Sequence, residues 1–477
     1  MKRLFLVLLV ILGIAFGFST SRRAVFAFAE KSLASFENLE SLKEKVPFLK
    51  DSDGAPGIGM GRNGKLLKPD AVRKWTLTDG REVDAVLVAA DAENVQLRIV
   101  KLQSVYQAPI RMFSESDREL IHSMVQSEGH KGVLGFPLSL KTHSWPDRWR
   151  GAEKMPLQRI GESNRWRSEH FEITNTAGLN PEAMSAIVRI CESVDGALSA
   201  LPLPLPVNWG RPEDKLRKIQ IEHESPSTGM SKVAGYWDPG TGIVHVYADL
   251  LLEPNRQLVV FEFDKPEKVQ KYDTIVHEVT HQSTAALIFL NVPAWVPEGL
   301  AEYMAATQYA PAAYQFNHTH VSLEYHINKW LLGDRIVKDR KMHLVHLEKL
   351  MNRDIQEWNL VAARGDEAGR LQYDESLLLM DFFIHRDHQD GVHFRRYLEC
   401  VLSGMPEPEA REVHLMRGRT YEEIERKLIE LWEPLGLTIN FQDRGQFQRG
   451  DVTIDWAAED VKRTIAAKRA SLEENVE

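Results

Sequence analysis

The sequence predicts an α+β fold, because strand patterns fill its first half and helical patterns fill its second half. Alternating apolar residues mark strands over residues 83–88, 95–100 and 168–174. Helical periodicity marks residues 183–201 and, toward the C-terminus, residues 373–386, 394–402 and 421–432. At 477 residues the chain is too long for one ordinary domain.

The composition is that of a folded protein, with 43% hydrophobic and 27% charged residues. The net charge of −9 is spread without long single-sign runs, so we expect no nucleic-acid partner. The two cysteines, Cys191 and Cys400, fall in helical patterns and are expected to be buried thiols. A long-range disulfide between them is the alternative if the protein is exported.

Residues 1–29 have the pattern of an export signal. Two basic residues precede an apolar run over residues 4–18, which suits the core of a signal peptide better than a full membrane span. Residues 27–29 read Ala-Phe-Ala, which predicts cleavage after residue 29. Arg22 and Arg23 precede that point, so an uncleaved N-terminal anchor is the alternative, and it is the only membrane contact we expect. We therefore expect export to the periplasm, the cell envelope or the medium.

A small β-module is expected after a short helix and a glycine-rich linker over residues 30–70. Strand patterns and turn residues alternate over residues 71–125, as in a small antiparallel barrel or sandwich. The phrases Arg73-x-Trp75-Thr76 and Phe113-Ser-Glu-Ser-Asp117-Arg118-Glu119 are similar to the Sla homology domain. That resemblance implies an all-β, SH3-like barrel that binds a protein partner. A spacer without a ligand is the alternative.

Residues 126–165 lack clear periodicity and are expected to form a linker. The larger domain is predicted over residues 166–440, with strands at 168–174, 218–222 and 243–247 before a mostly helical remainder. Residues 441–477 are charged and alanine-rich, which predicts a solvated helix or a frayed tail.

A metal-binding pattern lies inside the larger domain. His277-Glu278-x-x-His281 places two imidazoles one turn apart on one helix face, where both can reach one metal ion. Asn291-Val-Pro293 should end that helix, so a second helix can return with Glu298 as the third ligand. Two histidines, one glutamate and an open position form one of the standard catalytic zinc sets.

Two more carboxylates accompany the predicted ligands. Glu278, beside His277, is placed to take a proton from a zinc-bound water. Glu302, four residues after Glu298, is placed to accept the second N–H of a ligand imidazole. The alternative is that His277 and His281 are structural histidines capped by neighbouring carboxylates.

The predicted metal-binding segment is similar to that of a known enzyme family. His277-Glu278-x-x-His281 with Trp295-x-x-Glu298-Gly-x-Ala301-Glu302-Tyr303 is similar to the gluzincin metallopeptidases. Over about residues 168–440 the chain also resembles an uncharacterised family of exported bacterial peptidase-like proteins. These resemblances imply a zincin-like fold, a Zn²⁺ cofactor and a peptide or protein substrate. They also imply a side chain that donates a hydrogen bond to the oxyanion, usually a tyrosine. Tyr373 is the candidate, and Tyr303 and His385 are the alternatives.

The function expected from this site is zinc-dependent hydrolysis of peptide bonds. Residues 243–247 are predicted to form the strand edge along which a peptide pairs, with Tyr236 and Trp237 bordering the cleft. One alternative is a peptidase-fold binding protein without turnover. Another is an adaptor that acts through residues 71–125.

Overall fold

The structure, a computed structural model, describes residues 72–442 except 129–132, 136, 139, 141–143, 209–214, 225–233, 249–256, 263–264, 271, 290–291, 317–322, 324–340, 363–366, 389–390 and 436. The predicted signal at 1–29 and the linker at 30–70 lie outside the described residues, as does the predicted tail at 441–477 except for residues 441 and 442, which end a strand. Among the helices that are described, none is both long and apolar enough to cross a bilayer.

The β-module is an antiparallel sheet with its strands in chain order. The strands are β1 (Arg73–Thr76), β2 (Glu82–Ala90), β3 (Asn94–Ile99) and β4 (Ser104–Pro109), and β5 (Leu134–Gly135) pairs with β2. A 3₁₀ turn, η2 (Ile110–Met112), follows β4, and a single bridge between Leu77 and Phe113 joins the segment after it to the end of β1. The strands expected over residues 71–125 are therefore confirmed.

The β-module differs from the all-β barrel that the sequence predicts. The described strands do not close into a barrel, and the module contains helix α3 (Glu115–Glu128). Asp117 joins α3 to β1, because its carboxylate accepts hydrogen bonds from the Thr76 backbone N–H at 2.8 Å and from Arg73 at 3.0 Å. The alternating strand pattern in the sequence could not reveal a helix that follows the strands.

The main sheet has six strands in the order β11-β12-β10-β9-β8-β7. These are β7 (Gln158–Arg159), β8 (Arg165–Arg167), β9 (Phe171–Asn175), β10 (Arg217–Glu222), β11 (Gly235–Asp238) and β12 (Ile243–Tyr247). Strands β9, β10 and β12 are parallel, and β11 is antiparallel at the edge. The predicted edge strand at 243–247 is thus an interior strand, and the four residues of β11 form the edge instead.

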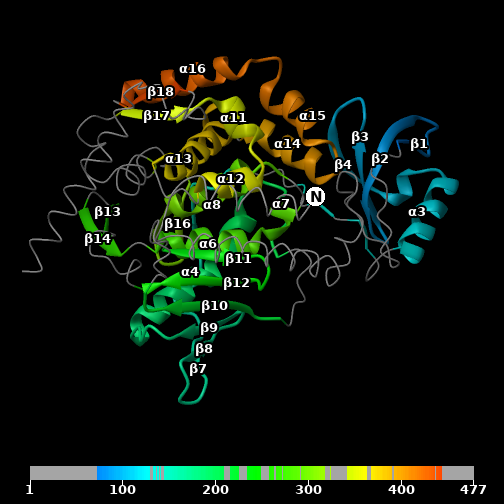
Figure 1. Ribbon diagram of the computed structural model, residues 1–477. Coiled ribbons are helices and arrows are strands. Elements are labelled where there is room, and N and C mark those ends of the chain that lie inside the picture. The colour runs from blue at the N-terminus through cyan, green and yellow to red at the C-terminus, as the bar shows by residue number, and fades with distance from the viewer. Residues whose placement is uncertain are drawn as a thin grey trace, which may run out of the picture.

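Shorter strands complete the β-structure (Figure 1). Strand β6 (Arg148–Arg150) pairs with β16 (Ala313–Gln315), which also pairs with β15 (Gln308–Ala310). Strands β13 (Gln257–Glu262) and β14 (Lys265–Gln270) form a hairpin, and β17 (Lys341–Val345) runs parallel to β18 (Thr438–Gln442). Residues 126–165, predicted to be a linker, therefore supply β5, β6 and β7 to three different sheets.

One face of the main sheet carries the core. Ile219 and Ile221 of β10 are buried, whereas Lys218 between Arg217 and Ile219 is exposed. Helix α4 (Pro181–Ala200) begins two residues before the predicted range, because the Asn180 side chain accepts the Ala183 backbone N–H at 2.8 Å and Pro181 occupies the first turn. Helix α4 packs on helix α6 (Asp273–Ser283), which is followed by α7 (Ala285–Phe289).

The C-terminal half is mostly helical, as predicted. The helices are α8 (Trp295–Thr307), α11 (Leu347–Asn352), α12 (Ile355–Ala362), α13 (Glu367–Asp381) with the π-turn η4 (Phe382–Arg386), α14 (Val392–Leu402), α15 (Glu407–Arg411) with the π-turn η6 (Glu412–Met416), and α16 (Tyr421–Trp432) with η7 (Glu433–Leu435). Thr420 and Glu423 form the capping box that opens α16.

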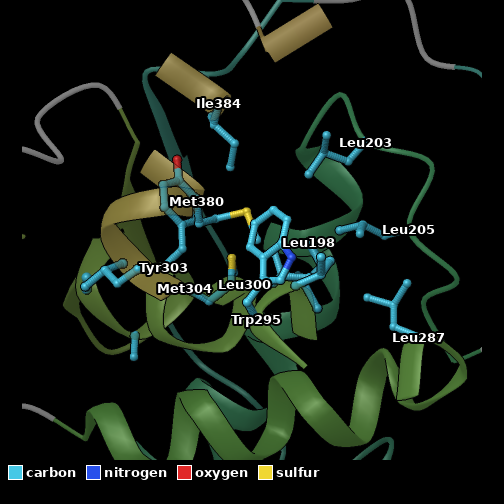
Figure 2. Packing of buried hydrophobic residues seen from close by; sticks show 14 of the residues in the cluster. Leu198, Leu203, Leu205, Leu287, Trp295, Leu300, Tyr303, Met304, Met380 and Ile384 are labelled. Carbon is cyan, nitrogen blue, oxygen red and sulfur yellow. The ribbon is translucent and has the colours of Figure 1, made fainter. Parts of the chain in front are cut away.

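Helices α8 and α13 approach each other closely at Gly299. A Cβ atom at this position would lie 2.6 Å from the carbonyl oxygen of Ser376, so only glycine allows this contact. Figure 2 shows the core beside this contact between α8 and α13, which we call the seam, where Trp295 and Met304 of α8 lie in one cluster with Met380 and with Leu198 of α4. The sheet half and the helical half therefore share one core.

The β-module packs against the helical half through β4 and α14. Val105 of β4 belongs to the large core cluster, and the Cys400 thiol of α14 lies 3.1 Å from the carbonyl oxygen of Gln103 and 3.3 Å from His414 Nε2. Both Cys400 and Cys191 are buried and free, which confirms the prediction of buried thiols.

Candidate metal centre

Helix α6 carries the first two predicted ligands. His277 and His281 lie one turn apart, their Nε2 atoms are 3.0 Å apart, and their ring centroids are 4.7 Å apart. Ile275, Val276 and Val279 are fully buried on the same helix, so α6 is held by packing on several sides. Packing of this kind fixes the rotamers of the two imidazoles relative to each other.

Helix α8 brings the third predicted ligand to the same point. Glu298 Oε2 lies 3.2 Å from His281 Nε2 and 3.5 Å from His277 Nε2. With bonds of about 2.0–2.2 Å, two ligand atoms of a tetrahedral zinc ion lie about 3.3–3.6 Å apart. The three observed separations, 3.0, 3.2 and 3.5 Å, are close to that spacing. His277, His281 and Glu298 could therefore hold one metal ion.

The charges around the imidazoles favour a cation. Glu302 Oε1 lies 3.0 Å from His277 Nδ1, the nitrogen that does not face Glu298. Burial lowers the pKa of His277, but Glu302, Glu298 and Glu278 together hold it well above its usual range. Burial raises the pKa of Glu298, but the two histidines outweigh it and lower that pKa to about 2. Three carboxylates beside two imidazoles suit a divalent cation.

His281 differs from His277 in the surroundings of its Nδ1 atom. His281 Nδ1 is buried and has no hydrogen-bond partner among the described residues. His277 Nδ1, in contrast, has the Glu302 carboxylate. Because the other nitrogen of a metal-bound imidazole is normally bonded, the Glu302 carboxylate would orient His277 if it held a metal ion.

Glu278 faces the edge of the main sheet. Its side chain is 9% exposed, and its Oε2 accepts the backbone N–H of Trp237 at 2.7 Å. Burial raises the pKa of Glu278, while His277 and His281 oppose that rise. Strand β11 lies directly against α6, because a Cβ atom at Gly235 would be 2.9 Å from Thr274 Cγ2 and 3.5 Å from Glu278 Cγ.

The contact between Glu278 and β11 was not predicted. The sequence predicts that Tyr236 and Trp237 border the cleft, but side-chain patterns assign no role to the backbone of β11. Gly235 opens a turn-rich phrase, Gly-Tyr-Trp-Asp-Pro-Gly, and was the only available signal. A glycine at the start of a strand can mark a close approach of two backbones or side chains.

Of the three candidates for the oxyanion donor, Tyr373 lies beside the metal ligands. Its ring centroid is 6.1 Å from that of His277, and Trp358 packs edge-on against it at 5.2 Å. Burial and the nearby Glu298 carboxylate hold the pKa of Tyr373 well above its usual range, so the phenol keeps its proton. The alternatives, Tyr303 and His385, are hydrogen-bonded to each other at 2.8 Å and both pack against Trp145.

No protein-family model matches the sequence, and no curated protein matches it either. The interpretation of the site therefore depends on its own geometry: two imidazoles and a carboxylate that could hold a metal ion, with a second buried carboxylate beside them.

Proposed function

We propose that the protein is a zinc-dependent hydrolase that cleaves peptide bonds. The main support for this proposal is that three atoms, His277 Nε2, His281 Nε2 and Glu298 Oε2, form a triangle whose sides measure 3.0–3.5 Å. Glu278 and Tyr373 adjoin this triangle. Three protein ligands leave one tetrahedral position open, which distinguishes a catalytic zinc set from a closed structural one.

Each residue has a role in this proposal. A zinc ion held by the triangle would polarise the substrate carbonyl and lower the pKa of a water molecule in the open position. Glu278 takes the proton from the attacking water and returns it to the leaving nitrogen, and its raised pKa suits a group that must both accept and donate. Tyr373 donates a hydrogen bond to the oxygen on which negative charge develops.

The substrate in this proposal is an extended peptide paired along β11. Edge strands present backbone groups that a peptide can bond as an added strand. Strand β11 is the edge of the main sheet on the side of α6, and Glu278 is bonded to it. Because the Trp237 N–H is already bonded to Glu278, a peptide paired there would use the other backbone groups along this edge and would lie next to the base.

The finer fold assignments are part of the same proposal. A zincin-like catalytic domain is supported by the mixed sheet with its antiparallel edge strand, by the metal-binding helix beside that edge, and by the mostly helical second half. An SH3-like module is supported by η2 after β4 and by the bridge between Leu77 and Phe113.

Metal analysis of the purified protein tests the proposal first. We expect about one zinc ion per chain in the wild type and a large loss in His277→Ala. His170→Ala is a matched control, because His170, just before β9, is also paired with a glutamate, Glu192 of α4, and lies outside the triangle. A wild type without bound zinc, purified without chelator and offered zinc, would contradict the proposal.

Cleavage of an unstructured protein such as denatured casein tests the second step. Glu278→Gln should keep its zinc and lose activity by about 10²-fold or more, because the base is removed while the ligands remain. Retained activity in this variant would exclude Glu278 as the base.

A further inference from the structure

Strand β11 directs its backbone groups alternately to the two sides. The Tyr247 backbone N–H donates to the Ala234 carbonyl at 3.0 Å, and the register pairs Tyr236 with His245 and Trp237 with Val244. Since hydrogen-bonded pairs alternate in an antiparallel ladder, the backbone N–H of Tyr236 faces β12 and that of Trp237 faces away. The N–H of Trp237 therefore points out of the sheet, toward α6.

This outward N–H meets the carboxylate of Glu278. The Trp237 nitrogen lies 2.7 Å from Glu278 Oε2, which is the short distance of a hydrogen bond to an ionised oxygen. Oε2 is committed to the strand, which leaves Oε1 to exchange a proton with a water molecule. Gly235, two residues earlier on the same side of the strand, allows this approach because it has no side chain to press against Thr274 of α6.

We propose that β11 positions the base: the Trp237 backbone N–H and the missing side chain at Gly235 hold the Glu278 carboxylate in its working orientation. The catalytic meaning of this contact rests on the proposed peptidase function, but the contact itself does not. Trp237 and Gly235 are positioning residues and do not touch the reacting atoms.

Hydrogen exchange tests the contact without any assay of activity. In the full-length protein, the Trp237 amide should exchange at least about tenfold faster in Glu278→Ala than in the wild type, because its acceptor is gone. The Tyr236 amide, which bonds β12, serves as the internal control and should not change. Equal exchange of the Trp237 amide in both proteins would overturn the proposal.

A matched pair of substitutions tests the consequence for catalysis. Trp237→Pro removes the outward N–H and places the proline ring against Glu278, whereas Trp237→Ala removes the side chain and keeps the N–H. Zinc content and thermal denaturation show whether each variant is folded and loaded. We expect kcat of Trp237→Pro to be at least about tenfold below that of Trp237→Ala, with similar KM and zinc content.

The outcomes separate this proposal from the function on which it rests. Equal kcat values in two folded, zinc-loaded variants would overturn the positioning role while the peptidase function stands. A wild type without peptidase activity, together with faster Trp237 exchange in Glu278→Ala, would refute the function and support the contact. If Trp237→Pro does not fold, Gly235→Ala replaces it and should lower kcat without loss of zinc.

Discussion

Glu399 should make the stability of this protein depend on pH. The carboxyl lies on α14 with a side chain that is 9% exposed, and Arg395 Nε is 3.7 Å away. Burial raises the pKa of Glu399 from 4.5 to about 7, because the nearby arginines do not fully offset the loss of hydration. Substituting Glu399→Gln removes the titrating group and keeps the shape of the side chain.

The direction of this pH dependence follows from the number of protons that the folded and unfolded states bind. Between pH 4.5 and about pH 7 the folded state holds a proton on Glu399 that the unfolded state has released, so the free energy of unfolding falls as pH rises through this window. The free energy of unfolding falls by about 1.4 kcal/mol for each pH unit in this window. Above pH 7 the ionised Glu399 carboxylate therefore destabilises the folded state by about 3 kcal/mol. Glu399→Gln should therefore be more stable than the wild type at pH 8 by up to that amount, and nearly equal to it at pH 4.

Urea denaturation at pH 4, 6 and 8, followed by tryptophan fluorescence, measures this difference. Glu409→Gln is a matched control, because Glu409 is an exposed carboxyl on the neighbouring helix α15. A stability difference between Glu399→Gln and the wild type that is the same at pH 4 and pH 8 would refute a raised pKa for Glu399. A variant less stable than the wild type at pH 8 would refute it as well.

Three further predictions concern the metal site and the seam beside it. Glu302→Gln should weaken zinc binding about 10- to 100-fold without abolishing it, measured by competition with a chelating dye, since Glu302 orients His277; unchanged affinity would contradict this role. Tyr373→Phe should lower kcat about 10²-fold at unchanged zinc content, whereas Tyr303→Phe should lower it far less, and equal losses would argue against Tyr373 as the oxyanion donor. Gly299→Ala should destabilise the protein by about 1–3 kcal/mol in urea, because the new Cβ would press on the Ser376 carbonyl; a gain in stability, as expected for glycine to alanine on an open helix, would show that the seam can relax.

The parts of the fold that local patterns determine could be predicted from sequence. Asn180 and Pro181 mark the start of α4, and Thr420 with Glu423 marks the start of α16, because capping depends on residues within one turn. The grouping of His277, His281 and Glu298 could also be predicted, because helical spacing places the two histidines and a proline-containing turn returns the chain.

The parts that depend on distant pairing could not be predicted. Strand β11 is only four residues long and lies in a turn-rich phrase, so the sequence pattern assigned the edge to residues 243–247. The bond from Trp237 to Glu278 uses a backbone N–H, which leaves no mark on side-chain composition. The short strands between residues 126 and 165 were missed for a related reason, since two or three residues are too few to show alternation.

The contact between β4 and α14 has a consequence for the design of truncated proteins. Cys400 is inert in the intact chain, because it is fully buried and burial raises its pKa to about 12. The Gln103 carbonyl that covers its sulfur belongs to the β-module. Removing residues 71–125 would uncover this thiol and make it available for oxidation or for crosslinking between molecules. A loss of activity after such a deletion could then come from a new disulfide rather than from the missing module, so the shortened protein should carry Cys400→Ser.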